Sequence, residues 1–143
     1  MLGDPAVMKF SLNGPLNEEQ IVGFIQKSKN RYKKEGVGLW AAELKGANRL
    51  IGLVGLPIQE VEGESQMELG YRLASAYWGC GYATEAAIAC RDYTFNNLKK
   101  RYLISMIEKE NTPSIRVAER VGMTWEREAT VWGIQAQIYS IRR

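Results

Sequence analysis

The residues best placed to do chemistry form a short loop of mostly small residues at positions 78–84. Residues 67–73 before it alternate apolar and other side chains as a strand does, and apolar residues after it recur at helical spacing. Glycine and alanine let a ligand approach the main chain closely. The first N–H groups of a helix have no internal partner and lie at the positive end of its dipole. The loop is therefore expected to bind a phosphate-like anion through its main chain.

The glycine pattern alone does not define the ligand, because a tight strand-to-helix turn without any ligand uses the same residues. A nucleoside-triphosphate loop would end in Gly-Lys-Ser or Gly-Lys-Thr, which this loop lacks. The dinucleotide pattern Gly-x-Gly-x-x-Gly is incomplete, because Glu85 or Ala86 stands where the third glycine should be. What remains is a pyrophosphate-binding turn of another type.

The loop resembles the signature of the GNAT superfamily of acyl-CoA-dependent N-acetyltransferases, Gln/Arg-x-x-Gly-x-Gly/Ala. Gly81 and Ala83 match its two small positions, while Trp78 stands where most members have Gln or Arg. The sequence of residues 77–86 is even more similar to that of the RimJ/RimL branch, which contains the ribosomal-protein N-terminal acetyltransferases.

A second match lies downstream of the loop. Residues 111–123 resemble the Asn-x-x-Ser helix of the same branch, which ends in Gly-Phe where this chain has Gly122 and Met123. The resemblance covers about residues 5–141. It implies a single acetyltransferase domain over residues 1–143 with acetyl-CoA as cosubstrate and no metal.

The resemblance also implies where acetyl-CoA binds. The pyrophosphate would lie on the loop, and the pantetheine arm would pair with the strand before it like an added strand. In the family, a main-chain N–H there polarises the thioester carbonyl. Asn111 and Ser114 match positions that contact the CoA arm and sulfur, although a turn-forming Asn and a helix-first-turn Ser explain them too. The expected cofactor-binding residues are Tyr71, Leu73, Trp78, Gly79, Cys80, Gly81, Tyr82, Ala83, Thr84, Asn111 and Ser114.

The acceptor amine has to lose a proton before it can attack a thioester. With a pKa of about 10, recruiting its neutral form at pH 7 costs roughly 4 kcal/mol. A carboxylate can take this proton. Glu68 is the candidate, because it lies within a Glu-Leu-Gly-Tyr that resembles a recurrent family element; a structural pairing with Arg72 is the alternative. Many members use a Tyr as general acid where this chain has Ala118, so Ser114 can at most donate a hydrogen bond.

The composition excludes several other kinds of site. The chain has no histidine, which removes Ser-His-Asp and Cys-His nucleophiles and every metal site that needs imidazole. Cys80 and Cys90 do not demand a disulfide, so the default location is a reducing cytoplasm. No apolar run approaches membrane-spanning length. The net charge of +3 is mild, and the basic run at residues 27–34 is typical of a solvated face rather than of a nucleic-acid site.

The order of the expected elements predicts an α/β protein with a mixed sheet and helices on its faces. The resemblance implies that this is the GNAT fold, with a mostly antiparallel central sheet between the helices. Thr112 is expected to cap the helix at residues 113–121. A glutamate-rich loop is expected at residues 60–64. The strand that usually opens this branch is not found before Pro5, so we expect an uncovered sheet edge or missing native residues. Such an edge predicts a homodimer. Strands are expected at residues 39–44, 50–56, 67–73, 101–108, 123–127 and 132–141, and helices at residues 18–35, after residue 84 and at residues 113–121.

These features predict an enzyme that transfers an acetyl group from acetyl-CoA to a primary amine by direct attack. The acceptor stays open between a protein N-terminus and a small amine such as a polyamine or an aminoglycoside. A different function is an acyl-CoA-binding module of the same fold that has little or no catalytic activity. A nucleic-acid binder would need aromatic residues interleaved with the basic run, and Tyr32 alone does not supply them.

Overall fold

The computed structural model describes residues 1–11 and 14–143. Its helices are α1 (Glu18–Glu35), α2 (Tyr82–Asn96) and α3 (Thr112–Val121), with a short 3₁₀ turn, η1 (Ser75–Tyr77). Its strands are β1 (Leu39–Leu44), β2 (Arg49–Gly55), β3 (Ile58–Val61), β4 (Glu64–Met67), β5 (Gly70–Leu73), β6 (Tyr102–Ile107), β7 (Thr124–Val131) and β8 (Ile134–Arg142). No described helix is long and apolar enough to cross a membrane.

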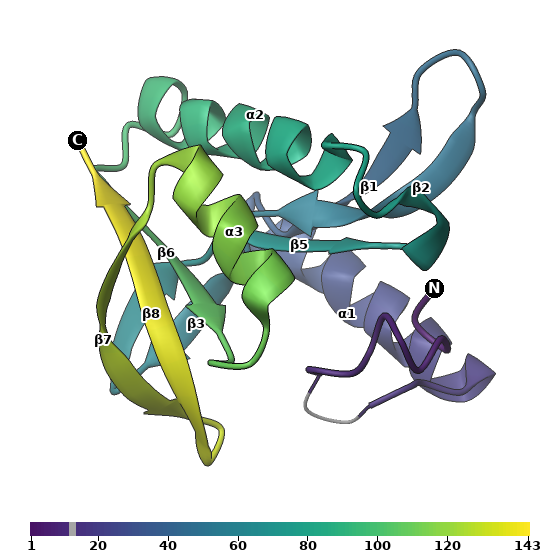
Figure 1. Ribbon diagram of the computed structural model, residues 1–143, viewed down its shortest axis with the longest axis horizontal. Coiled ribbons are helices and arrows are strands. Elements are labelled where there is room, and N and C mark those ends of the chain that lie inside the picture. The colour runs from purple at the N-terminus through teal and green to yellow at the C-terminus, as the bar shows by residue number, and fades with distance from the viewer. Residues whose placement is uncertain (12–13) are drawn as a thin grey trace.

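The strands form two antiparallel sheets that meet at one parallel junction. The order is β1-β2-β5 in one sheet and β6-β8-β7 in the other, while β3 and β4 form a separate hairpin. The junction is a parallel bridge between Glu68 and Ile104, where the Leu69 N–H donates to the Ile104 carbonyl at 2.7 Å. Figure 1 shows β5 and β6 side by side at this point and diverging beyond it. This mixed, mostly antiparallel arrangement confirms the predicted fold class.

The helices cover both faces of this arrangement. In Figure 1, α2 and α3 lie together on one side, and α1 passes behind β5 on the other. Ala87 of α2 and Ala118 of α3 are fully buried against a core that includes Leu69 and Leu103. Small residues let the two helices approach the sheet closely, whereas α1 has no buried residue and lies at the surface.

Hydrogen bonds define both ends of α1 and the pairing of the first two strands. Asn17 and Gln20 form a reciprocal capping box at the start of α1, and Gly36 ends that helix in the left-handed conformation. β1 and β2, at the two strand ranges expected first in the chain, pair as an antiparallel hairpin.

Three local predictions are wrong. Residues 60–64 are not a loop but belong to the β3–β4 hairpin, because Glu62 and Gly63 both adopt positive φ and form a two-residue turn. Residues 67–73 do not form one strand, because the chain leaves the β3–β4 hairpin at Met67 and joins β2 only from Gly70. The N-cap of α3 is Asn111 rather than Thr112, because the Asn111 side chain accepts the Ser114 N–H.

Candidate active site

The loop before α2 leaves the first turn of that helix uncapped. Gly81 is the N-cap residue with φ 81°, and no side chain caps α2 within the described part of the chain. The first N–H with a partner inside the helix belongs to Glu85, which donates to the Gly81 carbonyl at 3.0 Å. The N–H groups of Tyr82, Ala83 and Thr84 therefore point out of the helix end, as an anion-binding main chain requires.

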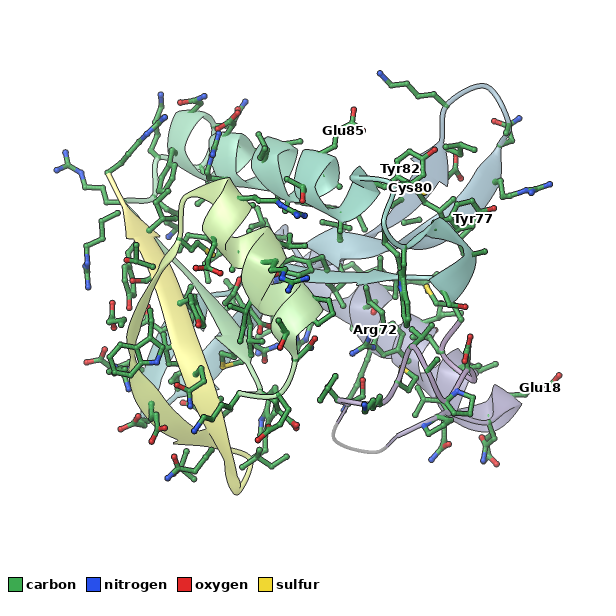
Figure 2. All side chains as sticks on the ribbon, in the orientation of Figure 1. Glu18, Arg72, Tyr77, Cys80, Tyr82 and Glu85 are labelled. Atoms are coloured by element: carbon green, nitrogen blue, oxygen red, sulfur yellow. The ribbon has the colours of Figure 1, made fainter. Side chains whose placement is uncertain are left out.

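The side chains of the loop are arranged around this helix end. Figure 2 shows Cys80 and Tyr82 at the start of α2, close to Tyr77. Cys80 is exposed, and the Tyr77 and Tyr82 rings lie 6.3 Å apart. Gly79 has φ 72°, so the loop contains two left-handed glycines within three residues. A Cβ on Gly79 or Gly81 would meet no protein atom within 4 Å, so both glycines face open space.

The strand that leads into the loop has a free main-chain edge. The Ala74 N–H donates to Ile51 of β2, whereas the Leu69 N–H donates to Ile104 of β6. Because hydrogen-bonding groups alternate along a strand, the main chains of Tyr71 and Leu73 point away from β2, on the side of Leu69. Beyond the bridge at Glu68, no described strand pairs with this edge of β5. It can therefore accept an extended ligand as an added strand.

Trp78 connects the loop to this edge. Its indole N–H donates to the Leu73 carbonyl at 2.9 Å, while half of the residue remains exposed. The Leu73 carbonyl therefore already accepts a hydrogen bond. The carbonyl of Tyr71 and the N–H groups of Tyr71 and Leu73 point to the same side of β5 and remain for a ligand. A Gln or Arg, as most members of the superfamily have here, offers no indole ring at this position.

Tyr71 connects the same edge to α3. Its phenol donates to the Ser114 carbonyl at 2.6 Å, and Ser114 in turn donates its N–H to the Asn111 side chain at 3.4 Å. Burial raises the pKa of Tyr71, and the nearby charge of Glu68 raises it further. Ser114 therefore contacts Tyr71 of β5, and Asn111, for which a turn-forming role was the alternative, caps α3.

Glu68 lies at the junction of β5 and β6. Gln59 Nε2 donates to its carboxylate at 3.2 Å. Burial raises the pKa of Glu68, while the Gln59 hydrogen bond, a main-chain hydrogen bond from Met106 and the charges of Arg31 and Arg72 oppose this shift. The described ion pairs do not include one between Glu68 and Arg72. A carboxylate with a raised pKa is a stronger proton acceptor than an exposed one.

Gln59 is a site residue that the sequence reasoning missed. It lies on β3 and reaches Glu68 only because the β3–β4 hairpin folds back on itself. The signal for a turn in the sequence was Gly63, because glycine readily adopts the positive φ that a two-residue hairpin loop requires. Because residues 60–64 were predicted to form a loop, the β3–β4 hairpin was not predicted, and neither was the contact of Gln59 with Glu68.

Two shallow hollows lie away from these residues. One of about 450 Å³ is lined by Trp125, Glu126, Arg142 and their neighbours on β7 and β8. The other, of about 380 Å³, is lined by Trp40, Ala89, Cys90 and Tyr93. Neither contains a predicted site residue. Among the described residues no group of three His, Cys, Asp or Glu side chains could hold a metal ion.

Comparison with known protein families identifies the family to which a protein with this site belongs. The sequence pattern of the Acetyltransferase (GNAT) domain matches residues 1–124 of this chain. The chain belongs to the GNAT acetyltransferase family. Members of this family use acetyl-CoA as cosubstrate, and the uncapped α2 and the free edge of β5 fit its pyrophosphate and pantetheine.

Related proteins agree with this assignment. The GNAT domain is 35% identical over 139 residues to the uncharacterized protein YkkB of Bacillus subtilis (strain 168), a match that covers 97% of this chain and 80% of YkkB. It is similar to the crystal structure of an acetyltransferase from Agrobacterium tumefaciens str. C58, with a TM-score of 0.84 and 27% identity over 99% of this chain and 81% of that one. A GNAT-family acetyltransferase from Bacillus anthracis gives a TM-score of 0.81 and 30% identity, covering 99% of this chain and 84% of that one.

Proposed function

We propose that this GNAT domain transfers an acetyl group from acetyl-CoA to a primary amine by direct attack, without a covalent enzyme intermediate. One observation carries the proposal. The free edge of β5 ends at the bridge of Glu68 on one side and leads through η1 and the loop to the uncapped start of α2 on the other. Anion site, strand edge and proton acceptor therefore follow one another along a single stretch of chain.

The order of these parts supports one direction for the bound cosubstrate. The N–H groups of residues 79–84 would hold the pyrophosphate, and the main chains of Leu73 and Tyr71 would pair with the amides of the pantetheine arm. β5 spans four residues, or about 13 Å at 3.3 Å per residue. The reactive end would then lie near the bridge, where β5 and β6 meet at Leu69 and Ile104.

The residues at this end have defined parts in the reaction. Acetyl-CoA supplies the acyl group as a thioester. Glu68 would accept one proton of the ammonium group, so that the neutral amine nitrogen forms a bond to the acyl carbon as the bond from carbon to sulfur breaks. The second proton that the nitrogen loses on becoming an amide would pass to solvent. A main-chain N–H of β5 would donate to the acyl oxygen. The leaving thiolate has a pKa near that of cysteine, so the Ser114 hydroxyl needs only to donate a hydrogen bond.

The proposal extends to the acceptor amine and to the branch of the GNAT superfamily. The sequence of residues 77–86 supports a RimJ/RimL-like enzyme. Such an enzyme would act in the cytoplasm on a protein N-terminus, and a small amine is the other candidate acceptor. Residues 14–34 and 131–137 are expected to contact the acceptor.

Binding and turnover measured on one preparation test the proposal. Calorimetric titration with acetyl-CoA is expected to give binding, and a panel of peptides and small amines is expected to give acetylated product. An acyl-CoA-binding module would give heat of binding without product on any amine. Binding without product would therefore replace the enzyme by that module, and absence of binding would contradict both.

A change at Gln59 tests the role of Glu68 through pH. Gln59→Met keeps the size of the side chain and removes the hydrogen bond that holds the Glu68 pKa down. The Glu68 pKa should then rise, so the acidic limb of the pH–rate profile should move to higher pH. A pH–rate profile on one accepted amine measures this. If the acidic limb of the Gln59→Met profile does not move and the variant is less stable, Gln59 only supports the fold.

We also propose that the protein forms a two-fold dimer. β1 pairs with β2 on one side, and no described strand pairs with its other side. An exposed strand edge is a template for pairing with another chain. Light scattering should give about twice the monomer mass of 16.2 kDa. A monomer at micromolar concentration would reject the dimer and leave the acetyltransferase proposal unaffected.

A further inference from the structure

The side chain of Arg72 lies on the side of β5 opposite to α3. Neighbouring residues of a strand point to opposite faces, and Tyr71 reaches α3 through Ser114. Arg72 instead donates from Nη2 to the hydroxyl of Ser11 at 2.8 Å. Figure 2 shows Arg72 extending from β5 toward the N-terminal segment. α2 and α3 cover the other face of β5, so an acceptor that reaches the Arg72 side chain would lie on this side, where α1 also passes (Figure 1).

The guanidinium of Arg72 has more hydrogen-bonding capacity than its described contacts use. It carries five N–H donors, and Ser11 accepts from one of its nitrogens. The ion pairs found among residues 1–11 and 14–143 do not include Arg72. Burial lowers the pKa of Arg72, and the charge of Glu68 raises it. A half-buried cation without a carboxylate in contact favours an anionic ligand.

The charges around Glu68 point to the same kind of ligand. Arg72 on β5 and Arg31 on α1 are the positive charges that act on the Glu68 carboxylate. A polyamine would bring further positive charge to this place and be repelled. An amine that carries a carboxylate near its nitrogen would match a proton acceptor beside a guanidinium, because each of its two groups meets the opposite charge.

We propose that the acceptor is an amine with a carboxylate close to its nitrogen, and that Arg72 binds this carboxylate while Glu68 faces the amine. This inference rests on the proposed acetyl transfer, and it names the substrate class of the same site. The carboxylate belongs either to a free amino acid or to an acidic residue next to the N-terminus of a peptide.

Matched acceptors test the inference and separate the two sources. The wild-type protein is assayed with alanine against alaninamide, and with C-terminally amidated peptides that begin Ala-Asp against Ala-Asn. The acidic member of at least one pair should have the higher kcat/KM. Arg72→Gln should lower that kcat/KM about 10- to 100-fold, through KM, because a charge-assisted contact is lost. The neutral member of the pair should change less than about threefold at a pH above the acidic limb of the pH–rate profile, because loss of the Arg72 charge also raises the pKa of Glu68.

Three control variants separate recognition from structure. Arg72→Lys keeps the charge without the planar fork and should recover part of the preference. Ser11→Ala removes the contact of Arg72 with the N-terminal segment and should keep the preference, and Arg120→Gln, on the exposed end of α3, should change nothing. Equal losses for acidic and neutral acceptors, with a lowered thermal midpoint in Arg72→Gln, would overturn the inference.

The wild-type results distinguish this inference from the proposed function. Acetylation of both members of every pair at equal kcat/KM would overturn the inference and leave acetyl transfer standing. Failure to acetylate any amine would reject the proposed function, and the inference with it.

Discussion

Replacing Glu68 by glutamine should lower kcat about 10²- to 10⁴-fold at neutral pH, because general-base catalysis typically contributes this much. Gln keeps the shape of the side chain and can still accept the hydrogen bond from Gln59. Affinity for acetyl-CoA should stay unchanged, since Glu68 lies beyond the end of the edge that would bind it. Part of the lost rate should return at higher pH, where more of the amine is already neutral.

The pH dependence of stability separates this role from a structural one. Burial raises the pKa of Glu68 in the folded state, so its contribution to stability is largest at low pH and is lost as pH rises through the raised pKa. Glu68→Gln should therefore not lower the thermal midpoint at neutral pH. Glu60→Gln, at an exposed position of β3, is the matched control and should keep full activity. Parallel pH–rate profiles for wild type and Glu68→Gln would remove Glu68 from the mechanism.

Replacing Gly81 by valine should weaken CoA binding by about 100-fold or more. Its φ of 81° is strained for any residue with a Cβ, and most of all for a β-branched one. The added side chain would also enter the open space in front of the α2 N–H groups. Hydrogen bonds to a charged group contribute about 1.5–3 kcal/mol each, so losing one or two of them gives this change. Calorimetric titration with CoA measures it.

Two other variants show whether the loss comes from the binding loop. Cys80→Ala should leave CoA affinity within a few-fold, because the exposed thiol is not part of the main chain that would hold the pyrophosphate. Gly63→Val introduces the same strain at φ 86° in the β3–β4 turn, where a Cβ also meets no protein atom. It should lower stability without lowering CoA affinity. Equal losses of affinity in Gly81→Val and Cys80→Ala would contradict a main-chain site.

The parts of the fold that depend on local chemistry could be predicted from the sequence. The Asn17–Gln20 capping box defines the start of α1, and the left-handed glycines at 81 and 122 define the boundaries of α2 and α3. The strand before the loop was predicted too long, because its alternation continues through Met67 and Glu68, where the chain in fact changes partners from β3 to β6.

The parts of the site that depend on distant pairing could not be predicted. Gln59 and Glu68 are nine residues apart and meet through a hairpin, and Tyr71 and Ser114 are forty-three residues apart and meet through packing of α3 on β5. Neither contact has a signal in the spacing of the residues. Arg72 was expected as an alternative partner of Glu68, whereas its described hydrogen bond goes to Ser11 across sixty-one residues.

The central claim is that acetyl-CoA binds along the free edge of β5 with its pyrophosphate at the start of α2. Backbone amide NMR spectra recorded during titration with CoA test it most directly, because the ligand is expected to contact N–H groups. The largest changes should fall on Tyr71, Leu73 and residues 79–84. Largest changes around Trp125 and Glu126, at the hollow between β7 and β8, or no changes at saturating CoA, would contradict the claim.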